Sequence, residues 1–211
     1  MPIKPLQNIN SDKSINNLKR FASLNLFIHK IYSSNPNNPV RNNMNITDKE
    51  VLAFLQALHD RGVKYMLVGG VATAFHGYVR ATQDLDLWIQ KTDENKEKLV
   101  NALQDVDVQG AELYRNISLI PGFSSVKIGE KGFEADLMEY MKSFTADQFD
   151  NCYKRARKTR FEGVPFNVIH MNDLIKEKKA AKRGKDKIDV EELEKIKKAT
   201  KARKGKKNHG R

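Results

Sequence analysis

The chain has 211 residues, of which 39% are hydrophobic, enough for one folded domain with appendages or for two small domains. No apolar run approaches the ~20 residues that a transmembrane helix needs, so we expect no membrane partner. The single cysteine, Cys152, excludes an internal disulfide and a cysteine-rich zinc site. Its isolation is typical of a reducing compartment and predicts a cytoplasmic location.

The formal charge of +12 is distributed unevenly along the chain. Residues 1–149 contain 17 basic and 17 acidic residues, whereas residues 150–211 contain 21 basic and 9 acidic residues. The whole excess therefore lies in the last third, which predicts a polyanionic partner such as RNA or tRNA there. The basic flank 154–160 fits such a partner and a solvated face equally well.

Both ends of the chain differ in composition from the middle. Residues 1–43 are rich in Asn and Ser, and we expect a disordered extension there, with helical potential in 15–32. Met44 opens a segment that resembles a protein start, so an over-extended reading frame is an alternative. Residues 193–211 predict a disordered basic tail, which leaves 44–192 as the folded domain.

The first elements of that domain have clear boundary signals. Thr47-Asp-Lys-Glu50 has the pattern of a capping box and predicts a helix that ends near Gly62. Residues 63–68 form a short apolar run, rich in β-branched and aromatic residues, that predicts a buried strand. Gly69-Gly70 ends this strand, and residues 71–78 have the length of two helical turns. The unpaired N–H groups at such a helix start favour a phosphate.

A second strand carries two carboxylates. In Asp84-Leu-Asp-Leu-Trp-Ile89, side chains alternate between faces, so Asp84 and Asp86 share one face while the leucines enter the core. Like charges placed side by side repel each other, and a divalent cation such as Mg²⁺ or Mn²⁺ would make the pair favourable. The alternative is a βαβ unit whose glycines only make a turn and whose aspartates face solvent.

The elements that follow are less distinct. A capped helix is expected over 92–103, and a hairpin over 125–138 with its turn at Gly129–Gly132. We further expect a helix over 144–158 and a second hairpin over 160–170. On the second strand of the first hairpin, Glu134 and Asp136 share a face, which an ordinary solvated edge strand would also explain.

The paired glycines, short helix and Asp84-x-Asp86 together resemble the signature of the DNA polymerase β-type nucleotidyltransferase superfamily. The resemblance is to its small stand-alone bacterial branch, which includes minimal nucleotidyltransferases and abortive-infection-type toxins. It implies an α/β (α+β) fold, in which helices flank a small mixed sheet and the C-terminal part is helical. It also implies a third metal-binding carboxylate on residues 133–138, Asp136 by best fit and Glu134 as the alternative.

A second motif begins at Leu174 and contains the pattern Lys178…Arg183…Asp186-x-x-Asp189. We expect Asn172 or Asp173 to cap a first helix, Gly184 to interrupt it and Asp186 to cap the next. The motif resembles the Lys…Arg-x-x-Asp-x-x-Asp segment of the toxin-like members, although Arg183 is followed here by Gly-Lys. That resemblance implies that Lys178 contacts a triphosphate and that Asp189 lies near the site. The alternative is a helix hairpin held by caps and salt bridges.

The sequence therefore predicts a metal-dependent enzyme that moves a nucleoside monophosphate from a triphosphate, ATP among the candidates, to an acceptor hydroxyl on RNA, tRNA or protein. A toxin–antitoxin or phage-defence setting, with a cognate partner protein, is a context that the branch implies. The expected metal ligands are Asp84, Asp86 and Asp136, and the catalytic set adds Lys178. The expected nucleotide-binding residues are Gly69, Gly70, Thr73, Arg80, Lys178, Arg183 and Asp189. The alternative is an inactive member that binds RNA or a partner protein.

Overall fold

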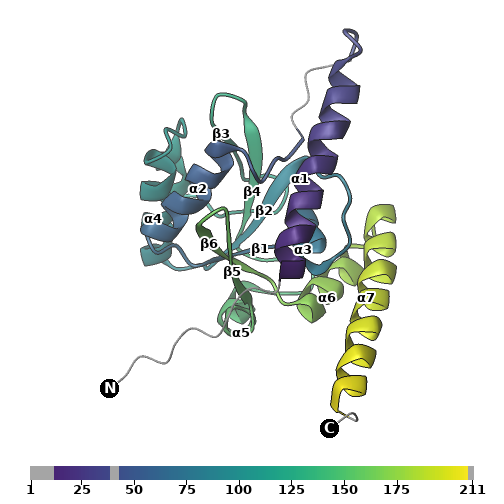
Figure 1. Cartoon of the computed structure of the whole chain (residues 1–211). Coiled ribbons are helices and arrows are strands. Elements are labelled where there is room, and N and C mark those ends of the chain that lie inside the picture. Colours follow the sequence, from purple (N-terminus) through teal and green to yellow (C-terminus); the bar gives the residue numbers. More distant parts are fainter. Residues whose placement is uncertain (1–11, 39–42, 209–211) are drawn as a thin grey trace.

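A six-stranded mixed sheet with helices on both faces forms the centre of the computed structural model, which describes residues 12–38 and 43–208 (Figure 1). The strands are β1 (Tyr65–Leu67), β2 (Asp84–Ile89), β3 (Ser125–Ile128), β4 (Phe133–Met138), β5 (Arg157–Phe161) and β6 (Val164–Val168). The helices are α1 (Asp12–Ser33), α2 (Lys49–Asp60), α3 (Gly69–His76), α4 (Asp93–Gln104), α5 (Phe149–Lys154), α6 (Met171–Ala181) and α7 (Gly184–Asn208), with 3₁₀ turns η1 (Ala111–Arg115) and η2 (Ala146–Gln148). This arrangement confirms the predicted α/β fold, in which helices flank a mixed sheet and the C-terminal part is helical.

The strand order β3-β4-β2-β1-β6-β5 places β2 and β4 side by side near the centre of the sheet. The two strands run parallel, while β1 pairs with β2 in the antiparallel direction. Leu85 and Leu87 are fully buried, as the alternation along β2 predicted, and Asp84 and Asp86 take the opposite face. Trp88 is also fully buried, and its indole N–H donates to the Glu139 carbonyl at 3.0 Å.

The helices divide between the two faces of the sheet. In Figure 1, α2 and α4 lie on one side, while α1, α3, α6 and α7 lie on the other. Helix α2 begins one residue later than the capping-box pattern indicated, because Asp48 rather than Thr47 accepts the Glu50 N–H at 3.0 Å. The Thr47 hydroxyl instead donates to Asn45 at 2.7 Å.

The helix predicted over 144–158 is much shorter in the structure. Only Phe149–Lys154 is α-helical, preceded by η2, and the chain enters β5 at Arg157. Pairing with β6 holds this segment as a strand, and the hairpin turns at Glu162 and Gly163, whose φ angles are +47° and +86°. The pairing of β5 with β6 therefore sets where the helix ends, and local helix propensity could not show this.

The N-terminal segment differs from the expected disordered extension. Residues 12–33 form α1, which packs beside α3, and its Leu18 and Phe21 are fully buried. Two of its asparagines are buried as well: the Asn17 amide donates to the Phe75 carbonyl, and Asn25 accepts the Thr82 N–H. Asn richness suggested disorder, but here these side chains satisfy backbone groups of the folded domain.

The C-terminal boundary also differs from the expected one at residue 192. Helix α7 continues to Asn208, and its Leu193 is fully buried. The disorder expected for residues 1–11, 39–42 and 209–211 concerns positions outside the described part of the chain. Among the described residues, no helix combines the length and apolarity that crossing a membrane requires.

Candidate active site

Two glycines at the start of α3 let neighbouring side chains pack directly against the helix backbone. Gly69 has a left-handed backbone with φ +55°, and a Cβ at this position would overlap the Asp86 carboxylate. A Cβ on Gly70 would lie 2.6 Å from the Thr82 hydroxyl oxygen. Glycine therefore lets two side chains from the β2 segment approach the helix backbone closely. The Gly70 N–H points at Asp86 Oδ2, 3.4 Å away.

Parallel pairing of β2 and β4 gathers the carboxylates on one face. The register sets Asp86 opposite Asp136 and Asp84 opposite Glu134. Asp84, Asp86 and Asp136 line one pocket of about 300 Å³, whereas Glu134 is exposed and does not line it. The choice of Asp136 over Glu134 as a pocket carboxylate thus follows from which residue the β4 segment places in the cavity.

Each of these three carboxylates accepts a hydrogen bond from a different donor. Asp84 accepts the Thr82 hydroxyl at 2.9 Å, and Asp136 accepts the Gly122 N–H at 2.9 and 3.2 Å. Accordingly, the described residues contain no group of three His, Cys, Asp or Glu side chains already gathered as metal ligands. The carboxylates share a cavity but are turned toward separate neighbours.

The carboxyl group of Asp86 has a strongly raised pKa. Its side chain is surrounded by protein yet keeps part of its surface open to the pocket. Burial, followed by the charges of Asp84 and Asp136, raises the pKa of Asp86 to about 7. The Gly70 N–H and the Lys178 ammonium act in the opposite direction but are weaker. Burial also raises the pKa of Asp136.

The donor set in this pocket fits a hard divalent cation. Such ions prefer carboxylate oxygens, and a cation would relieve the repulsion that raises the Asp86 pKa. The missing side chain at Gly69 leaves room for the Asp86 carboxylate itself, which also lines the pocket. Asp84, Asp86 and Asp136 are therefore the residues that would hold Mg²⁺ or Mn²⁺.

A buried ion network lies at the wall formed by α6 and α7. Lys178 is only 4% exposed and contacts Asp189 at 2.6 Å and Asp186 at 3.3 Å, both fully buried. Arg80 binds Asp189 through two nitrogens at 2.7 and 2.8 Å. Arg183 binds Asp186 at 2.6 Å and is otherwise exposed. Burial alone would raise the pKa of Asp186 and Asp189, but these cations and their hydrogen bonds hold both values below the usual range.

The structure brings most of the sequence-predicted residues to this pocket, but not all. Its lining includes Gly69, Asp84, Asp86, Asp136, Lys178, Arg183 and also Asp186. Four predicted nucleotide-binding residues, Gly70, Thr73, Arg80 and Asp189, do not line it. Thr73 is fully buried and its hydroxyl donates to the Gly69 carbonyl at 2.7 Å, so it supports the start of α3.

The capping of α6 also differs from the expectation. His170 rather than Asn172 or Asp173 occupies the N-cap, where its ring nitrogen accepts the Asn172 N–H at 3.2 Å. Asp173 instead binds Arg155 at 2.7 and 2.9 Å. Asp186 follows Gly184 inside α7, and its carboxylate serves the ion network.

Sequence reasoning missed three residues that shape the pocket. Thr82 positions Asp84 and packs on Gly70; Gly122 donates to Asp136; Glu177 accepts the backbone N–H groups of residues 142 and 143. Pro121-Gly122 gave a turn signal, yet nothing in it indicated a carboxylate partner. The Gly122 and Glu177 contacts join residues at least 14 positions apart, so only the folded chain shows them.

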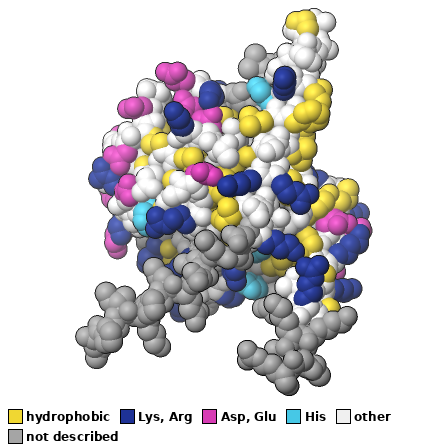
Figure 2. Space-filling model, viewed as in Figure 1, with side chains coloured by type: hydrophobic (Ala, Val, Ile, Leu, Met, Phe, Trp, Pro, Cys, Tyr) yellow, Lys and Arg dark blue, Asp and Glu magenta, His cyan; other side chains and the backbone are white. Residues whose placement is uncertain are grey.

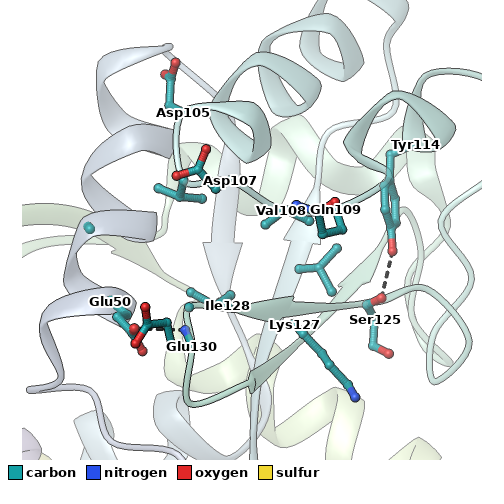
Figure 3. Close-up of a pocket in the computed structure, with 14 residues that line it drawn as sticks. Glu50, Asp105, Asp107, Val108, Gln109, Tyr114, Ser125, Lys127, Ile128 and Glu130 are labelled. Atoms are coloured by element: carbon teal, nitrogen blue, oxygen red, sulfur yellow. Dashed lines mark hydrogen bonds between the residues drawn. The ribbon is translucent and has the colours of Figure 1, made fainter.

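A larger cavity of about 780 Å³ lies elsewhere, between β3, α2 and the segment around η1 (Figure 3). Its lining includes Glu50, Asp105, Asp107 and Glu130, but neither paired glycines nor an arginine. The Glu130 N–H donates to Glu50 at 2.9 Å, and the Tyr114 hydroxyl donates to the Ser125 carbonyl at 2.7 Å (Figure 3). None of the predicted site residues lines this cavity.

Comparison with known families identifies the class of protein. A model of the family described as "Nucleotidyl transferase of unknown function (DUF2204)" matches residues 47–209. The chain belongs to this family. The expected relationship to nucleotidyltransferases is therefore confirmed, whereas the toxin-like branch stays a prediction.

Solved structures give weaker likenesses. The lincosamide antibiotic adenylyltransferase LnuA, bound to lincomycin, is 17% identical, with 74% of this chain and 99% of that chain covered and a TM-score of 0.46. An antigenic nucleotidyltransferase-like protein from Paracoccidioides brasiliensis is 19% identical, with 68% and 72% covered and a TM-score of 0.43. A comparison with curated proteins found no match.

Proposed function

We propose that this family member transfers a nucleoside monophosphate from a nucleoside triphosphate to an acceptor hydroxyl, with a divalent cation bound by Asp84, Asp86 and Asp136. The observation that carries the proposal is the convergence of these carboxylates, from two parallel strands, on a pocket next to a helix start whose glycines let Asp86 approach closely. Family membership supports the reaction class.

The pocket offers separate places for the triphosphate and the cation. The N–H groups at the start of α3 and the guanidinium of Arg183 are the positive groups that attract phosphate oxygens. Lys178 also lines the pocket, and its ammonium has three donors, two of which reach Asp186 and Asp189. The third is the donor that would contact the triphosphate, as the motif resemblance implies.

The carboxylates then perform two tasks. They hold the cation, which when bound supplies positive charge to the phosphate oxygens and lowers the pKa of an acceptor hydroxyl. Asp136 lies beside the Pro121-Gly122 turn, where it would orient the acceptor. In-line attack of the hydroxyl oxygen on the α-phosphorus forms the new ester bond, and pyrophosphate leaves.

RNA is the acceptor that the charge distribution favours. The basic excess of residues 150–211 includes α6 and α7, and α6 and α7 form one wall of the pocket. Figure 2 shows Lys and Arg side chains along α7. An RNA strand bound along α6 and α7 could place its end in the pocket next to the carboxylates. Neutralised phosphates release counterions, so binding should weaken steeply with salt.

The test is incorporation of label from each of the four α-labelled triphosphates into total RNA and into protein, with Mg²⁺, with Mn²⁺ and with a chelator. We expect metal-dependent labelling of RNA and release of pyrophosphate. Labelling of protein alone would show that the acceptor is protein rather than RNA, while the proposed transfer reaction would stand. No labelling with any metal or triphosphate, by protein that binds RNA, would favour the inactive, RNA-binding alternative.

The contribution of the basic end has its own test. Cutting the chain after Thr200 removes part of α7 that lies beyond its buried Leu193 and away from the pocket residues. RNA affinity should fall, and the slope of log K against log salt should become shallower by roughly 0.7 for each phosphate of a single strand that the protein no longer neutralises. Turnover at saturating RNA should change little. An unchanged salt slope would exclude this end as the nucleic-acid arm.

A further inference from the structure

The two walls of the catalytic pocket differ in chemistry. Lys178 and Arg183 come from the α6–α7 wall, whereas Pro121 and Gly122 form the wall at the β3–β4 side. The strand order β3-β4-β2-β1 spreads the carboxylates between these walls, with Gly69 following β1 and the turn at Gly122 preceding β3. A triphosphate bound at the cationic wall therefore leaves the turn as the wall that meets the acceptor.

Residues 120–123 form a tight and well-anchored β-turn. The Phe123 N–H donates to the Ile120 carbonyl at 3.0 Å, with Pro121 and Gly122 at the two central positions and Gly122 at φ +75°. A proline followed by a residue of positive φ is the pattern of a type II turn. The Ser124 hydroxyl accepts the Ile120 N–H at 2.9 Å, and the Glu139 N–H donates to the Leu119 carbonyl at 3.0 Å. The turn is thus fixed to the body of the domain.

This fixed turn holds an aromatic ring in solvent. Phe123 is 86% exposed, the highest value among the large hydrophobic side chains of the described residues, and Ile120 beside it is 41% exposed. An exposed phenyl group contributes little to the core, and its aromatic face is free to stack on a base. Phe123 itself does not line the cavity, but the two residues before it, Pro121 and Gly122, do.

The position of the ring relative to the chemistry is set by its neighbour. The Gly122 N–H reaches Asp136 at 2.9 Å, and Phe123 is the next residue, with its Cα about 3.8 Å further along the chain. A flat group stacked on this ring would lie outside the cavity. Phe123 thus directly follows the residue that binds the Asp136 carboxylate, which brings an acceptor stacked on its ring next to the pocket.

We propose that Phe123 is a stacking platform for the terminal nucleobase of an RNA acceptor, whose sugar hydroxyl enters the pocket beside Asp136. The inference rests on the proposed transfer reaction and names its acceptor more closely. Base–aromatic stacking needs no hydrogen-bond partner and tolerates any base. Phe123 therefore increases the affinity for RNA of any sequence. It does not affect the affinity for the triphosphate.

The test pairs a change in the protein with a change in the RNA. Two short oligoribonucleotides are compared, one ordinary and one whose last nucleotide keeps its ribose hydroxyls but lacks its base. Wild type, Phe123→Ala and Phe123→Trp are assayed for transfer and, by fluorescence anisotropy of labelled RNA, for binding. The matched control is Phe27→Ala on α1, because Phe27 is 62% exposed and lines no part of the pocket.

We expect loss of the base to raise the KM for RNA about 5- to 100-fold in wild type, the range that stacking of one base gives. Phe123→Ala should raise the KM for ordinary RNA by a similar factor and respond little to loss of the base, while Phe123→Trp and Phe27→Ala behave like wild type. The turnover number at saturating RNA and the KM for the triphosphate should be unchanged.

Equal sensitivity to the missing base in wild type and Phe123→Ala would overturn the inference, as would transfer to protein alone. If no variant shows transfer, the proposed reaction fails, and the anisotropy titrations still decide the platform. Stacking then predicts weaker binding of the base-free RNA by wild type but not by Phe123→Ala. Identical affinities of the wild-type protein for the two RNAs would exclude the stacking role of Phe123.

Discussion

The two acidic cavities of this protein differ in how their charges are balanced. In the larger one, Asp105 is held by Arg61 through two bonds of 2.6 Å, which lowers its pKa. Glu50 accepts the Glu130 N–H there, although its other oxygen is buried without a hydrogen-bond partner. In the smaller one, no ion pair among the described residues neutralises Asp84, Asp86 or Asp136, although Lys178 lies in the same pocket. Volume alone would favour the larger cavity. Unbalanced buried charge next to cations and a helix start indicates the smaller one as the catalytic pocket.

The sharpest test of this difference is Asp86→Asn. Transfer should be abolished, since the central carboxylate is lost, while the apo protein should melt at the same or a higher temperature. The pKa of Asp86 in the folded state, about 7, lies above its ordinary value of 3.8, so the folded protein loses stability as pH rises between these two values. At pH 8, Asp86→Asn therefore avoids the loss of folding stability that the buried Asp86 charge causes in the wild type.

Label transfer and thermal melts at pH 8, each with and without Mg²⁺, measure both effects. Transfer that survives at saturating metal would refute the metal assignment. A lower melting temperature in the metal-free protein would instead show that Asp86 stabilises the fold.

The next effect concerns the third carboxylate. Asp136→Ala should lower turnover at least about 100-fold, because metal-centred stabilisation is worth several kcal/mol and each 1.36 kcal/mol is a factor of ten. Glu134→Ala, on the same strand but exposed and outside the pocket, should change turnover less than about threefold. Turnover of the two variants at saturating substrates is the measurement, and the reverse ranking would assign the role to Glu134.

Stability should respond most to Lys178. Lys178→Met leaves Asp186 and Asp189 buried with one cation fewer, and breaking such a buried network costs about 3–5 kcal/mol. Arg61→Ala at the larger cavity removes a solvent-exposed pair and should leave the denaturation midpoint nearly unchanged. Urea unfolding of both variants makes the comparison, and an equal loss of stability in the two would contradict it.

The same variant predicts a pH dependence. The pKa values of Asp186 and Asp189 are held below the usual range, so their stabilisation is present at neutral pH and is lost as pH falls through the acid range. The difference in unfolding free energy between wild type and Lys178→Met should therefore narrow below about pH 4. A constant difference down to about pH 3 would show that packing, not charge, accounts for the destabilisation.

Residues that share a strand could be placed from the sequence, because alternation is a local rule. It set Asp84 and Asp86 on one face and Leu85 and Leu87 in the core, as the structure has them. The choice of Asp136 came from a resemblance, since no local pattern tells which strand will lie beside β2. The partnership of Gly122 with Asp136 depends on a turn packing against β4 from 14 residues away.

The failures at the chain ends have the same origin. The composition of 1–43 indicated a disordered extension with helical potential in 15–32. The helix is present as α1, and it packs beside α3 and makes asparagine contacts such as Asn17 with the Phe75 carbonyl. Likewise, Thr73 is among the residues expected to bind nucleotide, whereas in the structure its hydroxyl donates to the Gly69 carbonyl. Tertiary contacts decide such cases, and composition does not encode them.

The smallest effect is expected at the larger cavity. Asp107 is exposed there and has a left-handed backbone with φ +56°, a conformation that asparagine also tolerates. Asp107→Asn should therefore leave the fold intact, and transfer should stay within about twofold of wild type, since one surface charge far from the carboxylates is largely screened in physiological salt. Turnover and the KM for RNA, measured beside Asp86→Asn, give the comparison. A change of about tenfold in either would mean that the larger cavity takes part in the reaction, and that unbalanced charge is an incomplete criterion for the site.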